Sequence, residues 1–213
     1  MSTRTVSVWA WAVVLVCTAI SAAQNVNQFN DASEVSQWRF DFGNVPHTTA
    51  FDPTMDSGGN ASSGSMKVTL NFDSTLSGNN KAAYTRDLAQ GAIPANVTGM
   101  QMDIKVDPSS APDAFGDNGF FSLVVRNTGN YDYNQQFGDN IKAADGWRHI
   151  SVSPLTGGFN DIRGVTWQLY GGPSQNINGP VTLWIDNVAF TPEPSSISCL
   201  GAVVIAVVIR RRR

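Results

Sequence analysis

The sequence predicts an all-β domain over residues 24–191, a two-sheet β-sandwich flanked by an N-terminal signal peptide and a single C-terminal transmembrane helix. Three observations support this. Helical periodicity is almost absent from the central region, where short stretches alternate apolar and polar residues. Gly, Pro, Asn, Asp and Ser separate these stretches. Charge-free apolar runs occur only near the two ends of the chain. Eight or so short strands with little helix indicate a sandwich.

The N-terminus has the three parts of an export signal. Arg4 begins a weakly positive region, and residues 6–20 form an apolar stretch. The small residues Ser21, Ala22 and Ala23 follow, so we expect cleavage after Ala23. The alternative is an uncleaved membrane anchor. In either case the central region is exported.

The central region contains one candidate helix of one or two turns, over residues 31–38. A Gly/Ser/Asn-rich stretch, 56–65, predicts a surface loop and not a linker between domains. Alternation predicts the main strands at 66–72, 100–106, 120–126, 131–137, 148–153, 165–170 and 181–190.

Composition limits the function of the exported region. Residues 24–191 hold 9 of the 14 basic and 16 of the 17 acidic residues, which gives a formal charge of −7. This charge disfavours nucleic acid as a partner. About 168 residues suffice for one domain with its own core. Cys17 and Cys199 both lie outside this region, so it has no disulfide.

The C-terminus combines three elements in a fixed order: a Pro-Glu-Pro motif, the apolar run 197–209, and an arginine cluster. The arginines orient their end of the run toward the cytoplasm, so the preceding domain lies outside. The run is short for a bilayer, but arginines can snorkel and the bilayer can thin. The alternative is a C-terminal core helix with a basic end. The motif and the cluster are Pro192, Glu193, Pro194, Arg210, Arg211, Arg212 and Arg213.

This order of elements resembles the PEP-CTERM sorting tail of bacterial exported proteins. The resemblance implies processing by an exosortase, a membrane protease that cuts near the motif. It also implies a cell-envelope protein, anchored by its helix before processing and at the cell surface or in an extracellular polysaccharide matrix afterwards.

A second resemblance covers the last third of the central region. The strand that begins at Trp147, the Ile-x-x-Val-x-aromatic pattern from Ile162 and the Ile-Asp-Asn-Val-x-Phe pattern from Ile185 look like galactose-binding-like jelly rolls. These include many carbohydrate-binding modules. The first strand departs from their pattern, because it lacks the usual Glu-Asp-Gly run.

The jelly-roll resemblance implies a structural calcium ion as the one expected cofactor. Asp186 matches a ligand position in the last strand, and Asp31 and Asn30 lie near the first strand. Calcium accepts such irregular sets of oxygen ligands. The alternative is that Asp186 and Asn187 form a β-bulge through local hydrogen bonds.

Sugar binding requires aromatic rings beside hydrogen-bonding groups on one sheet face. In 165–170 the alternation places Gln168 and Tyr170 opposite the apolar side chains. If strand 148–153 is a neighbour, His149 joins them, with Arg126 beside them. Tyr131 and Tyr133 are candidate ring platforms at the edge. The alternatives are ordinary half-buried packing for the tyrosines and a plain surface role for His149.

The sequence offers little for catalysis. The region has two histidines, His47 and His149, and none of the hydrolase, zinc-protease or phosphate-loop motifs. Its one glutamate is Glu34, and its aspartates lie mostly in polar loops. We therefore expect a non-catalytic protein that binds glycan or takes part in a polysaccharide or biofilm matrix. The alternatives are a structural or adhesive surface protein without a sugar site, and a polysaccharide-active enzyme.

Overall fold

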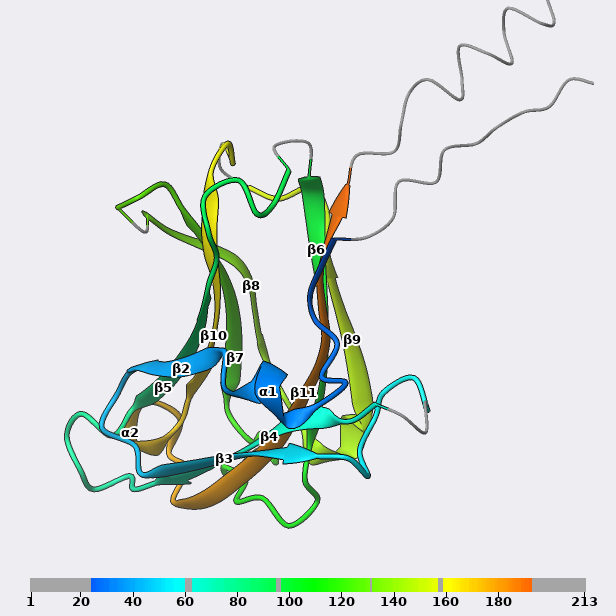
Figure 1. Ribbon diagram of the computed structural model, residues 1–213. Coiled ribbons are helices and arrows are strands. Elements are labelled where there is room, and N and C mark those ends of the chain that lie inside the picture. Colours follow the sequence, from blue (N-terminus) through cyan, green and yellow to red (C-terminus); the bar gives the residue numbers. More distant parts are fainter. Residues whose placement is uncertain (1–23, 60–62, 95–96, 131, 157–158, 193–213) are drawn as a thin grey trace, which may run out of the picture. The chain divides into compact units, whose positions relative to one another are not determined.

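Two antiparallel β-sheets face each other in the computed structural model, which describes residues 24–59, 63–94, 97–130, 132–156 and 159–192 (Figure 1). The six-stranded sheet contains β1 (Gln24–Asn27), β3 (His47–Asp52), β4 (Ser65–Phe72), β6 (Val97–Val106), β9 (Trp147–Val152) and β11 (Gly179–Pro192). The five-stranded sheet contains β2 (Trp38–Phe42), β5 (Lys81–Asp87), β7 (Phe120–Asn127), β8 (Asp132–Asn140) and β10 (Ile162–Tyr170). This architecture confirms the predicted all-β sandwich.

The strand orders are β3-β4-β11-β6-β9 and β2-β5-β10-β7-β8. The long strand β11 organises its sheet, because β6 pairs along one side of it while β4 and β1 share the other side. The predicted bulge is present. The pairing with β6 shifts register between Asp186 and Ala189, and Asn187 has a φ of 49°.

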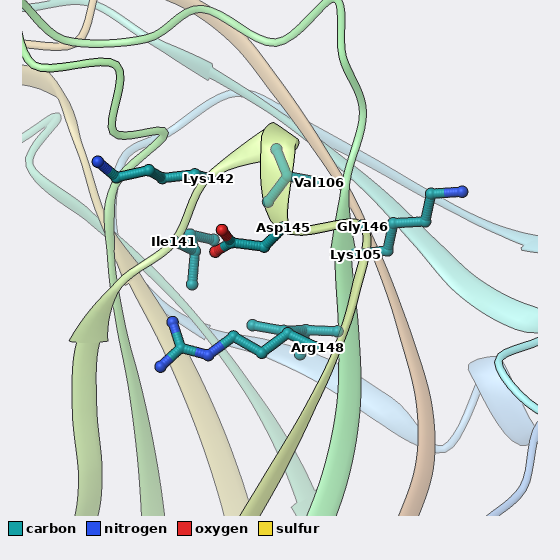
Figure 2. Close-up of a pocket in the computed structure, with 8 residues that line it drawn as sticks. Lys105, Val106, Ile141, Lys142, Asp145, Gly146 and Arg148 are labelled. Carbon is teal, nitrogen blue, oxygen red and sulfur yellow. The ribbon is translucent and has the colours of Figure 1, made fainter.

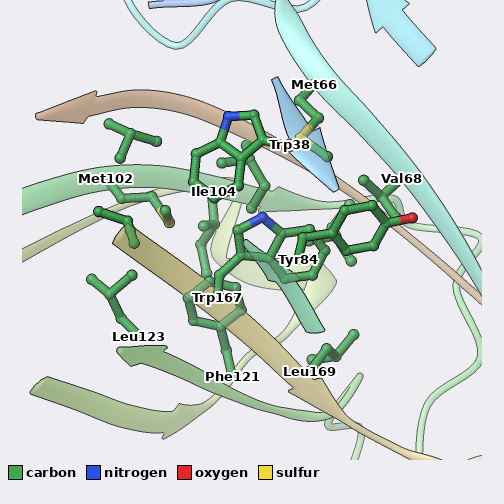
Figure 3. Packing of buried hydrophobic residues seen from close by; sticks show 14 of the residues in the cluster. Trp38, Met66, Val68, Tyr84, Met102, Ile104, Phe121, Leu123, Trp167 and Leu169 are labelled. Atoms are coloured by element: carbon green, nitrogen blue, oxygen red, sulfur yellow. The ribbon is translucent and has the colours of Figure 1, made fainter. Parts of the chain in front are cut away.

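The core lies between the sheets and is built from every second residue of the central strands. Trp167 of β10 is fully buried and stacks on Tyr84 with ring centroids 4.7 Å apart (Figure 3). Phe121 stacks on the same indole at 6.1 Å. From the other sheet, Met102 and Ile104 of β6 contribute buried side chains. Trp167 therefore packs in the core, as predicted. Trp147, at the start of β9, lies only partly buried.

The predicted helix over 31–38 shrinks to one turn, α1 (Ala32–Val35), because the chain turns into β2 at Trp38. Asp31 caps this turn by accepting a hydrogen bond from the Ser33 amide at 2.7 Å. The Glu34 carboxylate accepts hydrogen bonds from the backbone amides of residues 28–30. The only glutamate of residues 24–191 therefore holds the turn that joins β1 to β2. The other helices are η1 (Ala143–Asp145) and α2 (Gly172–Gln175).

All seven strands named from the sequence are present, with ends shifted by up to three residues. Four others give no clear alternation. In β5, four consecutive residues from Ala82 to Thr85 are buried, because side chains cover both faces of this strand. The short strands β1 and β3 are largely polar and exposed, and β2 begins at Trp38, the last residue of the expected helix.

The predicted signal peptide, residues 1–23, lies outside the described residues. So does the sorting tail, apart from Pro192 at the end of β11. None of the helices in the described part of the chain is long and apolar enough to span a bilayer.

Candidate functional site

The outer face of the five-stranded sheet carries four rows of side chains that follow the strand register. The rows are Lys81, Tyr170 and Phe120; then Ala83, Gln168, Ser122 and Gly138; then Thr85, Thr166, Val124 and Gln135; then Asp87, Gly164, Arg126 and Tyr133. The residues of the second and third rows are buried on β5, β10 and β7. The larger side chains of the first and fourth rows, which we call the outer rows, stay partly exposed. We call Thr85, Ser122, Thr166 and Gln168 the polar floor.

Gln168 positions two tyrosines over this floor. Its side-chain oxygen Oε1 accepts hydrogen bonds from the Tyr133 hydroxyl at 3.1 Å and from the Tyr170 hydroxyl at 3.2 Å. The Tyr133 side chain remains 47% exposed, and burial raises the pKa of Tyr170. The two rings therefore approach one amide group from the opposite outer rows, and both keep hydroxyl lone pairs that can accept further hydrogen bonds.

Arg126 and Asp41 close the end of the floor at which Tyr133 lies. The Arg126 Nε donates to the Thr166 hydroxyl at 3.1 Å, and its guanidinium carbon lies 5.2 Å from the centre of the Tyr133 ring. The hydroxyls of Thr166 and Thr85 are 2.7 Å apart, and Thr85 donates to the Asp41 carboxylate at 2.9 Å. These contacts make a continuous polar network across β7, β10, β5 and β2.

Aromatic rings and a lysine occupy the opposite end. The Lys81 ammonium lies 4.4 Å from the centre of the Phe42 ring and 5.3 Å from that of Tyr170. Phe42 is 58% exposed. Phe120 meets Tyr170 edge-on at 6.0 Å and packs over Gly138, where a Cβ would lie 2.6 Å from its ring. A side chain at position 138 would therefore clash with the Phe120 ring in its present position.

One hydroxyl of the floor lacks a partner. The Ser122 Oγ is fully buried and has no hydrogen bond to any residue that the structure describes. An unsatisfied buried hydroxyl costs about 1–3 kcal/mol, so its presence on an outer sheet face needs an explanation.

The structure brings together four of the six predicted sugar-binding residues: Arg126, Tyr133, Gln168 and Tyr170. His149 is elsewhere, because β9 belongs to the other sheet and does not neighbour β10. The assumption that these strands are adjacent was wrong. Tyr131 lies outside the described residues.

Sequence reasoning missed Phe42, Lys81 and Asp41, which lie on β2 and β5, strands without a clear alternation signal. It also missed Phe120, although its strand was predicted. Phe120 has the parity of Arg126 on that strand, which was the one signal that could have placed it on this face.

The predicted calcium ligands make other contacts. Asp186 is fully buried at the β11 bulge and accepts hydrogen bonds from the amides of Ser57 at 2.9 Å and Asn187 at 2.7 Å. Burial raises its pKa to about 6. Asp31 caps α1, and the Asn30 side chain is exposed.

Among the described residues, no group of three or more His, Cys, Asp or Glu side chains could hold a metal ion. Calcium binding therefore stays a prediction. A calcium titration followed by the melting temperature tests it, and an unchanged melting temperature contradicts it.

Two hollows formed by described residues lie away from the predicted site. One lies between β6, η1 and the start of β9, lined by Val106, Ile141, Lys142, Asp145 and Arg148 among others, and has no room for a water molecule (Figure 2). A second, of about 300 Å³, lies beside β1 and α1. Its Glu34 and Asn27 side chains are already hydrogen-bonded within the β1–α1 turn. Neither hollow has an aromatic lining residue.

No family model matches this sequence, and no curated protein matches it. Its fold is similar to that of solved structures, among them the following three. One is described as a carbohydrate-binding module of the β-sandwich superfamily, with TM-score 0.55 and 12% identity over 78% of this chain. This chain spans 61% of that structure's length.

The second is the CBM27-1 module of Caldicellulosiruptor saccharolyticus in complex with mannohexaose, with TM-score 0.55 and 15% identity. The match covers 81% of this chain and 97% of the module. The third is an arabinose-bound α-L-arabinofuranosidase, MgGH51, with TM-score 0.54, 14% identity and 83% coverage of this chain. Only 27% of that enzyme is matched. At these low identities the structural similarity shows the fold alone: the described region has a β-sandwich architecture that is also found in carbohydrate-binding modules.

Proposed function

We propose that this protein binds glycan on the outer face of its five-stranded sheet, without catalysing a reaction there. The observation that carries the proposal is the pair of tyrosines held by Gln168. Sugar rings present apolar C–H faces to aromatic rings, while their hydroxyls need donors and acceptors beside those rings. Tyr133 and Tyr170 supply the rings, and their hydroxyls, together with the partly exposed Lys81 and Arg126, supply the hydrogen-bonding groups.

The similarity to carbohydrate-binding modules agrees in fold. For this chain we extend the likeness from fold to ligand class, and propose a polysaccharide chain lying across the floor between the two outer rows.

The setting is also part of the proposal. The sorting-tail resemblance supports an exported, exosortase-processed protein of the cell envelope, anchored by its tail before processing and working in the extracellular polysaccharide matrix. Glycan binding and matrix location fit each other, because a module that holds polysaccharide is useful where polysaccharide is secreted.

Glycan-array binding by the purified full-length protein tests the function. We expect micromolar to millimolar binding to a polysaccharide, and a loss of at least tenfold in affinity for Tyr133→Ala and for Tyr170→Ala. Trp147→Ala is the matched control, since it removes a partly buried aromatic ring from the other sheet. Tyr133→Phe keeps the ring and separates stacking from the hydroxyl contact.

Unchanged glycan binding in both alanine variants would exclude this face. Absence of binding to every glycan would favour the alternative of a structural or adhesive protein without a sugar site. Release of reducing sugar from a bound polysaccharide would favour an enzyme.

A further inference from the structure

The two cations on the proposed glycan-binding face differ in how well they are neutralised. The Arg126 guanidinium, with 17% of its side chain exposed, lies 3.6 Å from the Asp41 carboxylate. Lys81 forms no ion pair with any described carboxylate, and instead lies over the rings of Phe42 and Tyr170. A partly buried ammonium with aromatic but no anionic neighbours is a position that an external anion could occupy.

The acidic groups of this face are already used. Arg39 donates to the Asp87 carboxylate at 2.7 Å and also pairs with Asp41. Three cations, Arg39, Lys81 and Arg126, therefore face two carboxylates, although residues 24–191 as a whole carry a formal charge of −7. The face is locally positive on an acidic protein.

The pKa of Lys81 is consistent with a locally positive face. Burial, followed by the positive charge of Arg126, lowers the pKa of Lys81. The two cations thus repel each other across the polar floor. An anionic group bound near Lys81 would relieve this repulsion and replace part of the lost hydration.

We propose that the glycan recognised here is acidic, a polysaccharide whose sugars carry carboxylates, with one carboxylate bound by Lys81 while its ring packs against Phe42 and Tyr170. This inference rests on the proposed glycan-binding function and names its ligand class. Phe42 and Tyr170 provide the apolar surface for the sugar ring, and Lys81 lies between them, within reach of a substituent on that ring. A charge-assisted hydrogen bond to the carboxylate then adds to stacking.

The test compares two polymers with the same backbone, polygalacturonate and its fully methyl-esterified form, against the full-length protein in mild detergent. We expect the free acid to bind about tenfold more tightly at low salt, as one hydrogen bond to a charged group predicts. Added salt should reduce this difference, because the contact is partly exposed.

Two lysine variants make the test specific. Lys81→Met keeps the aliphatic stem and should lower affinity for the acid about tenfold while leaving the ester unaffected. Lys67→Met is the matched control, since Lys67 also lies over an aromatic ring, that of Trp184 at 5.4 Å, but on the other sheet. It should bind like the wild type.

Equal affinity for acid and ester, or an unchanged Lys81→Met variant, would overturn the inference. If the protein bound the ester or another neutral polymer as tightly as the acid, and Tyr133→Ala abolished that binding, glycan binding at this face would be supported and the preference for acidic glycans rejected. Tighter binding to dextran sulfate than to polygalacturonate would replace the carboxylate with a sulfate ester. No binding to acidic or neutral polymers would contradict the proposed function itself.

Discussion

The outer faces of the two sheets use the same kinds of side chain in opposite ways. On the six-stranded sheet, Lys67, Trp184, Lys105 and Trp147 are register partners on β4, β11, β6 and β9, so cations and indoles alternate across the sheet. The Trp184 ring lies within 6 Å of both lysines and donates its N–H to Asp52 at 3.0 Å. Trp184 is only 6% exposed.

The five-stranded sheet leaves its aromatic residues more open. Phe42 and Tyr133 are about half exposed, and beneath them lies a floor with one unsatisfied hydroxyl. An aromatic ring beside a lysine is therefore not a binding site by itself. The two faces differ in whether the aromatic rings, lysines and carboxylates already contact one another. On the six-stranded face the Trp184 ring contacts two lysines and Asp52, whereas on the five-stranded face Phe42 and Tyr133 remain exposed. The polar and aromatic groups of the six-stranded face satisfy each other, whereas the five-stranded face is the one for which we propose binding.

The largest loss of stability is expected when the buried Trp184 indole of the six-stranded sheet is removed. We expect Trp184→Ala to lower the free energy of unfolding by about 3 kcal/mol, because a large buried ring is lost and the Asp52 contact with it. Urea denaturation measures the change. Tyr133→Ala should cost less than about 1 kcal/mol, because its ring is half exposed. Equal losses in the two variants would remove the distinction between the faces.

The Asp186 carboxyl under the β11 bulge should make stability depend on pH. Its pKa is about 6 in the folded protein and near 3.8 ordinarily. Between these values the folded protein binds the extra proton, so the free energy of unfolding should fall as pH rises from about 4 to about 6, by roughly 2 kcal/mol.

Asp186→Asn should flatten this slope in denaturation curves collected across that pH range. The carboxylates with lowered pKa values, such as Asp52 and Asp107, act in the opposite direction and lose their contribution below about pH 4. Stability that rises between pH 4 and 6 equally in both proteins would contradict the prediction.

The smallest expected effect is the difference in stability between the Lys67→Met and Lys81→Met variants. Lys67→Met should destabilise the fold by about 0.5–1 kcal/mol, because its ammonium lies over the Trp184 ring at 5.4 Å. Lys81→Met should be neutral or slightly stabilising, since burial and Arg126 disfavour the Lys81 charge. Thermal melting resolves the difference, and a larger loss for Lys81→Met would assign Lys81 a structural role.

Sequence reasoning reached part of the candidate site because it used alternation within one strand. Gln168 and Tyr170 lie opposite Trp167, as predicted, and Trp167 is in the core. The error with His149 came from a different step, the assumption that consecutive strands are neighbours. The chain crosses from one sheet to the other between β9 and β10, and no local pattern marks that crossing.

Local sequence alone specifies which side of each clearly alternating strand faces the core, because side-chain direction alternates with every residue of an extended backbone. It also determined the acidic charge and the lack of cysteine in residues 24–191. The folded arrangement of the strands is what places Lys81 and Phe42 beside Tyr170, and Arg126 beside Tyr133. These neighbours come from strands far apart in the chain, and their pairing depends on how the whole core is buried, which no short segment encodes.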